Sequence, residues 1–185
     1  LKKLLNNNIH GAKMLTGSYV AMITPFTGDN KLNEKELERM INFQIEHGSA
    51  GIVPCGTTGE SPTLSWDEHM RVIEMSAQIG KGKIEVMAGT GSNCTNEAIK
   101  ATQHAQEVGA DYALVVTPYY NKPTQEGIFQ HFKAISDNTD IGIVIYNIAG
   151  RSGVNITPET IERISKLNGV VGIKEAAGCV NQASD

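Results

Sequence analysis

Short apolar, β-branched runs alternate with amphipathic stretches of helical length along the chain. Runs such as "AGIVPCG" (50–56) and "IGIVIYN" (141–147) are apolar at successive positions, which is typical of parallel strands covered on both faces. The pattern predicts six strands, at residues 18–26, 50–56, 84–89, 111–120, 141–147 and 170–176. It predicts five helices, at residues 33–48, 65–80, 95–110, 124–138 and 157–167.

Capping residues support three of these helices. Ser65 is expected to cap the helix at 65–80, with Glu68 in the capping-box position three residues later. Thr95 is expected to cap the helix at 95–110, and Thr157 the helix that starts with Pro158.

A repeated strand–helix unit predicts a parallel sheet, either doubly wound or closed into an eight-fold barrel. The dinucleotide version of the first is disfavoured, because "AGTGSN" (88–93) is only a G-x-G turn. The polar segments "GTTGE", "GTGSN", "TPYYN", "YN" and "KEAAG" all follow strand C-termini, where barrel enzymes build their sites. A complete barrel needs roughly 240 residues or more. We therefore expect an α/β fold, a (β/α)8 TIM barrel truncated after the sixth strand, with residues 14–185 as a partial catalytic domain and residues 1–13 as a leader or upstream extension.

Composition narrows the functional class. The 185 residues are 40% hydrophobic and carry a net charge of −4, so nothing suggests a nucleic-acid partner. No apolar run is long enough to span a membrane. Three widely spaced cysteines without a CxxC pair favour a reducing, cytoplasmic setting, and five histidines without HxxxH or HxH spacing disfavour a metal site.

Lys174 ends the sixth predicted strand, "VVGIKEA". At the mouth of a barrel we expect its amine to be partly desolvated, which raises the neutral, nucleophilic fraction. A neutral lysine can attack a ketone and form an imine, which then acts as an electron sink. The alternative is a lysine that extends its ammonium into solvent. Glu175 is expected to point to the opposite face of the strand.

Tyr146 ends the neighbouring predicted strand, so its side chain is expected to reach the same volume as Lys174 and to shuttle protons there. The alternative is a core tyrosine whose hydroxyl is simply hydrogen-bonded. "TPYYN" (117–121) adds two tyrosines, one for a hydroxyl relay and one that could face a partner chain.

The segment "GTTGE" (56–60) places two hydroxyls between glycines after the second strand. Its amides and hydroxyls could converge on a carboxylate or a phosphate, although the GK[ST] ending of a phosphate loop is absent, and a plain turn is the alternative. Arg151 on a later loop could bind a second carboxylate or could be a solvated surface residue.

Five motifs occur in order between about Leu15 and Gly178: "GTTGES", "AGTGSN", "VTPYYNKPTQEGIFQHFKAI", "YN…GRSGVNITPET" and "GIKEAAG". Together they resemble the dihydrodipicolinate synthase (4-hydroxy-tetrahydrodipicolinate synthase) family of pyruvate-dependent class I aldolases, in the N-acetylneuraminate lyase superfamily. "GTTGE", "PYYN" and the loop arginine favour this family over N-acetylneuraminate lyase and the keto-deoxy sugar acid aldolases, which share the barrel and the lysine. Those relatives stay the alternative within the enzyme class, and a non-catalytic barrel fragment is the alternative outside it.

The resemblance implies a lyase of lysine and diaminopimelate biosynthesis that condenses pyruvate with L-aspartate 4-semialdehyde, without a metal or diffusible cofactor. It implies that Lys174 forms a Schiff base with pyruvate and that Tyr146 passes protons to and from the imine. It implies that Thr57, Thr58 and Gly56 bind the pyruvate carboxylate, and that Thr57 also belongs to a hydroxyl relay. Tyr120 would complete this relay from a neighbouring subunit. Arg151 would bind the carboxylate of the semialdehyde. A homodimer or homotetramer follows from the shared relay.

The resemblance also implies an L-lysine effector at the dimer interface. The residues at matching positions are Asn93, Glu97, His69 and Tyr119, with Trp66 at the edge. In two places the chain departs from the family pattern. Ala149 stands where a proline is usual, which predicts a more flexible loop around Arg151, and the chain stops at Asp185. We therefore expect this polypeptide on its own to be poorly soluble or inactive, since a strand edge would be left open.

Overall fold

The computed structural model describes residues 15–184, so the expected leader at residues 1–13 lies outside the described residues. The strands are β1 (Tyr19–Ala21), β2 (Gly51–Val53), β3 (Glu85–Gly89), β4 (Tyr112–Val116), β5 (Gly142–Asn147) and β6 (Val170–Glu175). The helices are α1 (Glu34–Glu46), α2 (Trp66–Gly80), α3 (Thr95–Glu107), α4 (Gln125–Ser136), α5 (Ala149–Ser152), α6 (Pro158–Ile164) and α7 (Val180–Ser184), with a 3-10 turn, η2, at Ser61–Thr63.

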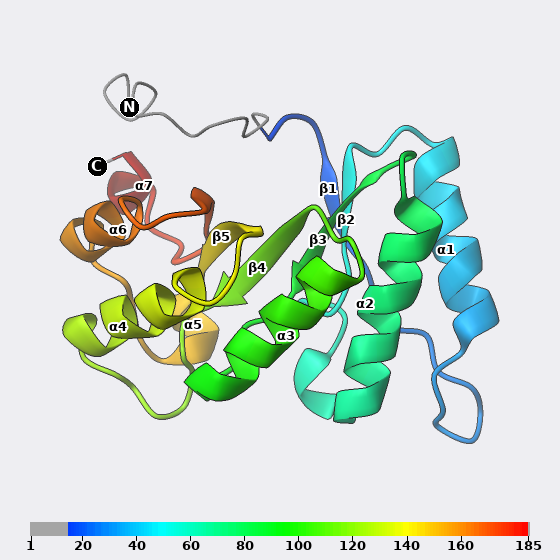
Figure 1. Cartoon of the computed structure of the whole chain (residues 1–185), viewed down its shortest axis with the longest axis horizontal. Helices are drawn as coiled ribbons and strands as arrows, with labels where there is room; N and C mark the ends of the chain where they lie inside the picture. The colour runs from blue at the N-terminus through cyan, green and yellow to red at the C-terminus, as the bar shows by residue number, and fades with distance from the viewer. Residues whose placement is uncertain (1–14, 185) are drawn as a thin grey trace.

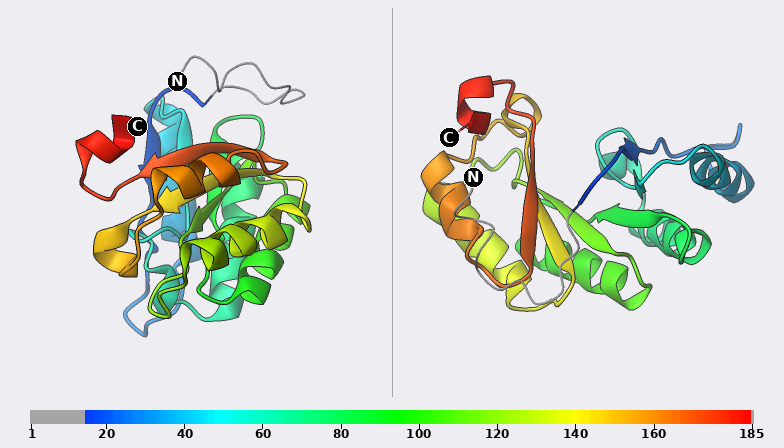
Figure 2. Two further views of the ribbon diagram at one scale, coloured as in Figure 1. Left: turned by 90° about the vertical axis from the view of Figure 1, so that its left-hand side faces the viewer. Right: turned by 90° about the horizontal axis from the view of Figure 1, so that it is seen from above.

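The six strands form one parallel sheet in the order β1-β2-β3-β4-β5-β6. The sheet curves, and the helices cover its convex side (Figures 1 and 2). A doubly wound sheet reverses its strand order at a switch point, whereas here each strand pairs with the next one along the chain. The prediction of a (β/α)8 barrel without its last strands is therefore confirmed, with β1 and β6 as the two edges of the described sheet.

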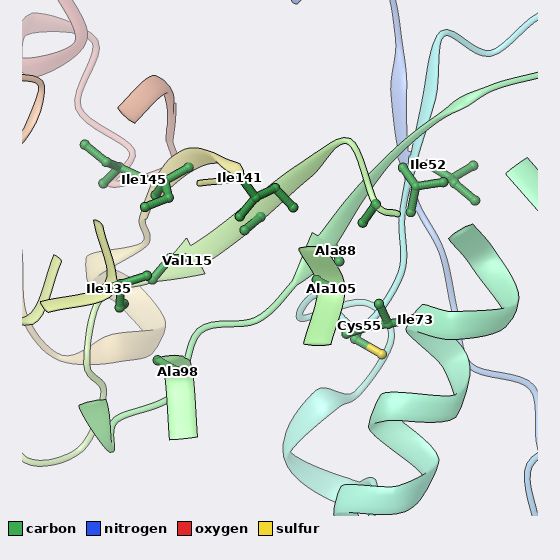
Figure 3. Packing of buried hydrophobic residues seen from close by; sticks show 14 of the residues in the cluster. Ile52, Cys55, Ile73, Ala88, Ala98, Ala105, Val115, Ile135, Ile141 and Ile145 are labelled. Atoms are coloured by element: carbon green, nitrogen blue, oxygen red, sulfur yellow. The ribbon is translucent and has the colours of Figure 1, made fainter. Parts of the chain in front are cut away.

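The main hydrophobic core lies between the sheet and the helices (Figure 3). Ile52 and Val115 of the strands belong to this core together with Ile73 of α2 and Ile135 of α4, and all four side chains are fully buried. Because side chains alternate across a strand, the neighbouring positions point to the concave face. There they form a second cluster: Val53, Met87, Tyr112, Leu114, Val144 and Tyr146.

The helix starts agree with the sequence at two of the three expected caps. The Ser65 hydroxyl accepts from the Glu68 amide, and the Glu68 carboxylate accepts from the Ser65 amide, so the predicted capping box is present. Thr157 occupies the N-cap position of α6. The expectation for Thr95 is wrong: Cys94 is the N-cap of α3, and the Thr95 hydroxyl is 2.9 Å from Nδ1 of His131 instead.

The strands are shorter than predicted, most clearly β1 and β4. The Thr117 amide still bonds to the Tyr146 carbonyl, at 3.1 Å, but Pro118 follows and has no amide hydrogen for the ladder. The residues that follow these strands belong to the loops that carry the polar motifs.

Candidate active site

Tyr146 and Lys174 are direct neighbours at the C-terminal ends of β5 and β6. The two residues are partners in the parallel register, and both point to the concave face of the sheet. The Lys174 Nζ atom lies 4.4 Å from the centroid of the Tyr146 ring, which is a cation–π contact. The amine and the phenol therefore share one small volume, as the sequence predicts.

Lys174 differs from the sequence expectation in its exposure. Its side chain is solvent-exposed rather than partly desolvated. The reason is its position: β6 is an edge strand of the described sheet, so one flank of the side chain has no neighbouring strand.

A small pocket opens at the C-terminal ends of β2 to β5, beside Tyr146. It is lined by Cys55, Gly56, Thr57, Ser61, Gly89, Gly91, Leu114, Val116 and Tyr146. The structure thus brings Gly56, Thr57 and Tyr146 to one cavity, and Lys174 lies against the ring of Tyr146. Thr58 is exposed, on the same turn as Thr57.

Close backbone contacts shape this pocket. A Cβ atom at Gly89 would lie 2.1 Å from the Cys55 carbonyl oxygen, and one at Gly91 would lie 2.4 Å from the Val116 amide nitrogen. Only glycine lets the ends of β2, β3 and β4 approach this closely. The "AGTGSN" motif is therefore a packing feature of the pocket wall.

The "GTTGE" turn is anchored to the end of β1 by Thr24, a residue that the sequence analysis did not select. The buried Thr24 hydroxyl donates to the Gly59 carbonyl at 2.6 Å. Within the turn, the Gly59 amide donates to the Gly56 carbonyl, and the Glu60 amide donates to the Thr57 carbonyl. This anchoring holds the turn that brings Thr57 to the pocket, while Thr58 is exposed on the same turn. A threonine next to proline in "ITP" was the available signal in the sequence.

Cys55 was also not selected, although it lines the pocket. Burial raises the pKa of its thiol to about 12, so the group is neutral at physiological pH. Its Sγ atom donates a weak hydrogen bond to the His69 carbonyl. Cys55 is accordingly a wall of the pocket rather than a nucleophile.

Tyr120 projects into solvent, with 89% of its surface exposed. Its backbone has φ of +72°, and its amide donates to the Ser152 carbonyl at 3.3 Å, so the segment is tied to α5. Tyr120 is not among the residues that line the pocket of its own chain.

Arg151 is exposed on α5, close in sequence to Tyr146. The loop expected to be flexible at Ala149 is a helical turn, closed by Gly153 in the left-handed conformation. The Ser152 hydroxyl reinforces it by donating to the Ile148 and Val154 carbonyls. The arginine is thus carried on an ordered turn.

The residues expected to bind an effector fall into two groups. Trp66 and His69 stack at the start of α2, with ring centroids 5.6 Å apart, and burial lowers the pKa of His69 to about 4. Glu97 accepts from the Ser92 hydroxyl at 2.7 Å, and the Asn93 carbonyl accepts from the Asn121 side chain. Tyr119, the remaining member, is half-buried.

Between residues 15 and 184, His, Cys, Asp and Glu side chains form no group of three or more that could hold a metal ion. In the same range, no helix has the length and apolar character that crossing a membrane requires.

The comparison with known proteins agrees with the fold and the motif order. The model of the dihydrodipicolinate synthetase family matches residues 14–185. The chain belongs to this family. It is 53% identical over 172 residues to 4-hydroxy-tetrahydrodipicolinate synthase of Pelobacter propionicus, an alignment that covers 93% of this chain and 59% of that protein. The chain therefore spans less than two thirds of the length of this curated relative.

Solved structures of the family superpose closely. Chloride-inhibited dihydrodipicolinate synthase from Acinetobacter baumannii, complexed with pyruvate, matches with a TM-score of 0.87 and 46% identity, over 90% of this chain and 57% of that one. The lysine-bound enzyme from Cyanidioschyzon merolae matches with a TM-score of 0.87 and 39% identity, over 92% of this chain and 59% of that one.

Proposed function

We propose that this family member condenses pyruvate with L-aspartate 4-semialdehyde as a 4-hydroxy-tetrahydrodipicolinate synthase, a lyase of the lysine and diaminopimelate pathway. The observation that carries the proposal is the contact between Lys174 and Tyr146, with Nζ 4.4 Å from the ring centroid beside a pocket that Thr57 also lines. The names of the matched relatives point to the same reaction.

Lys174 supplies the nucleophile. Its neutral amine attacks C2 of pyruvate, and the resulting carbinolamine loses water to give a protonated imine. Loss of a proton from C3 then gives an enamine, whose C3 attacks the aldehyde carbon of the semialdehyde. The amino group of the semialdehyde next attacks C2 and displaces Lys174, which closes the six-membered ring and frees the enzyme.

Tyr146 handles the protons of these steps, because its phenol is held next to the amine that becomes the imine. Thr57 and Thr58, with the Gly56 amide, hold the pyruvate carboxylate at the anchored turn. Arg151 on α5 binds the carboxylate of the semialdehyde, since a guanidinium can donate two parallel hydrogen bonds to a carboxylate.

Tyr120 completes the relay in a partner subunit. Its nearly full exposure in this chain supports that role, since the ring and hydroxyl are accessible to a second chain. A homodimer or a homotetramer is the corresponding assembly.

The test is reductive trapping with borohydride in the presence of pyruvate, on the protein as its gene encodes it. We expect mass spectrometry to find a reduced pyruvyl group on the peptide that holds Lys174, and to find none in Lys174→Met. Lys166→Met is the matched control. Lys166 is exposed, lies before the start of β6 rather than at its C-terminal end, and forms an ion pair with Glu162. An unlabelled Lys174 in folded protein overturns the proposal.

L-Lysine is the proposed effector, and the lysine-bound relative supports it. The Glu97 carboxylate would attract the ammonium group of the ligand. Titration of L-lysine in the condensation assay should lower the rate, and Glu97→Gln should weaken this inhibition without changing the uninhibited rate. A rate independent of L-lysine removes the effector but leaves the catalytic proposal standing.

A further inference from the structure

We propose that Glu175 and Asn147 are positioning residues which, from the convex face of the sheet, fix the register that brings Lys174 against Tyr146. The inference rests on the proposed function, because it concerns the geometry of the imine-forming amine. Neither residue touches the pocket; both act through the backbone of the strand that carries their catalytic neighbour.

A register shift in β6 decides which face Lys174 occupies. Val170 pairs with Ile143 and belongs to the core on the convex side, but Gly172 pairs with Val144, so one extra residue, Val171, is inserted. In a regular strand Val170 and Lys174 would share a face, because side chains repeat every two residues. The bulge reverses this relation, and Lys174 joins the concave face.

A slip of one residue would turn every later side chain to the other face. Hydrophobic burial opposes such a slip only weakly at the end of β6, because Ile173 is 40% exposed. At Lys174 such a slip would place the amine among the helices and Glu175 beside Tyr146. A specific interaction must therefore hold the last two register pairs of β5 and β6, Tyr146 with Lys174 and Asn147 with Glu175.

The side chains of Glu175 and Asn147 hold the register at the last residue pair of β5 and β6. The two residues are register partners, and the Asn147 amide group donates to both carboxylate oxygens of Glu175, at 3.2 and 2.9 Å. Asn147 is fully buried, and its own oxygen accepts from the Ile156 amide. Glu175 also accepts from the Ala177 amide at 2.7 Å and from the Gln182 side chain at 3.1 Å.

The chemistry of this network favours one register strongly. Glu175 faces three different donors, so an acceptor-only carboxylate suits the position. A shift of one residue would break both hydrogen bonds between the buried Asn147 amide and the Glu175 carboxylate, and losing bonds to a charged acceptor is unfavourable. The network thus stabilises the arrangement in which Lys174 faces inward.

The test compares Glu175→Gln, Asn147→Asp and the exchanged double variant N147D/E175Q. Asn147→Asp sets two carboxylates against each other, and Glu175→Gln places an amide nitrogen among the three donors that now bond to the carboxylate. The double variant again sets an amide donor opposite a carboxylate acceptor. We expect each single variant to lower the borohydride trapping rate at Lys174 and kcat by about 10- to 100-fold, which is the effect of a displacement near 1 Å. The double variant should recover most of this loss, and KM for pyruvate should change little, because the "GTTGE" turn lies on another strand.

Gln106→Leu is the matched structural control. The Gln106 side chain accepts from the Asp140 and Ile141 amides at the opposite end of β5. This variant should lower the melting temperature as the single variants do, but leave the trapping rate unchanged. If melting temperature and trapping rate fall together in all variants, the role is merely structural and the proposal fails.

The outcomes separate this inference from the function on which it rests. Trapping in the unaltered protein together with normal trapping in folded Glu175→Gln overturns the positioning role alone. No trapping in the unaltered protein overturns both. If a single variant does not fold, the double variant still decides, because a folded double variant with a low trapping rate contradicts the pairing.

Discussion

The Lys174 ammonium lies over the ring of Tyr146, 4.4 Å from its centroid, and the two residues are partners in the β5–β6 register. The contact joins the proposed nucleophile and the proposed proton carrier on neighbouring strands, without any intervening element. If the proposed mechanism holds, the ring of Tyr146 positions the amine and its hydroxyl moves protons, so the two roles can be tested separately.

Tyr146→Phe separates these roles. The ring remains against Lys174, so slow trapping of pyruvate should still label the lysine, but kcat should fall by about 10²- to 10⁴-fold because the proton carrier is lost. Tyr146→Leu should also impair trapping, since the ring is gone. Steady-state rates and end-point mass spectrometry distinguish the two, and a Tyr146→Phe enzyme with the original kcat would contradict the assignment.

Thr24→Val tests the anchor of the "GTTGE" turn. The change keeps the shape of the side chain but removes the buried hydrogen bond to the Gly59 carbonyl, so the free energy of unfolding should fall by about 1–3 kcal/mol. KM for pyruvate should rise, because the turn that holds the carboxylate is loosened. Thr24→Ser retains the hydroxyl and should keep KM near its original value; equal KM values in both variants would exclude the anchoring role.

Gly89→Ala tests the close contact at the pocket wall. The new Cβ would lie 2.1 Å from the Cys55 carbonyl oxygen, so β2 and β3 must move apart. Overpacking against backbone is expected to lower the free energy of unfolding by about 3 kcal/mol. Urea denaturation measures this, with Gly28→Ala as control, because nothing lies within 4 Å of a Cβ there. Equal stabilities of the two variants would show that β2 and β3 can move apart at Gly89 without loss of stability, which would contradict the prediction.

The buried histidines should make stability fall in mild acid. Burial lowers the pKa of His131 from 6.5 to about 4, and the same holds for His69. Between these pH values the unfolded chain takes up a proton that the folded state does not, so the free energy of unfolding decreases as the pH falls from 6.5 towards 4. Each histidine accounts for up to about 3 kcal/mol.

His131→Asn isolates one histidine. The amide keeps a polar atom near the Thr95 hydroxyl, 2.9 Å from the original Nδ1, but does not titrate. Chemical denaturation at a series of pH values should give a shallower slope in the variant between pH 6.5 and 4. Identical slopes would mean that His131 is protonated in the folded state.

Much of the fold could be predicted from local pattern. Continuous apolar runs and amphipathic helices gave the strand–helix repeat, and Ser65 with Glu68 marked a helix start, because these signals depend on residues a few positions apart. Thr95 was misassigned because its hydroxyl is taken by His131, which is distant in the sequence. Thr24 and Cys55 were missed for the same reason: their roles arise from contacts between strands.

The sequence by itself determined the order of the elements, the positions of the polar motifs at strand ends and the pairing of Tyr146 with Lys174 on adjacent strands. Only the tertiary structure decided which face Lys174 occupies. A bulge at Val171 reverses the alternation along β6, and Asn147 and Glu175 hold the register that follows it. Side-chain direction in a strand depends on pairing with its neighbour, and that pairing exists only once the sheet has formed.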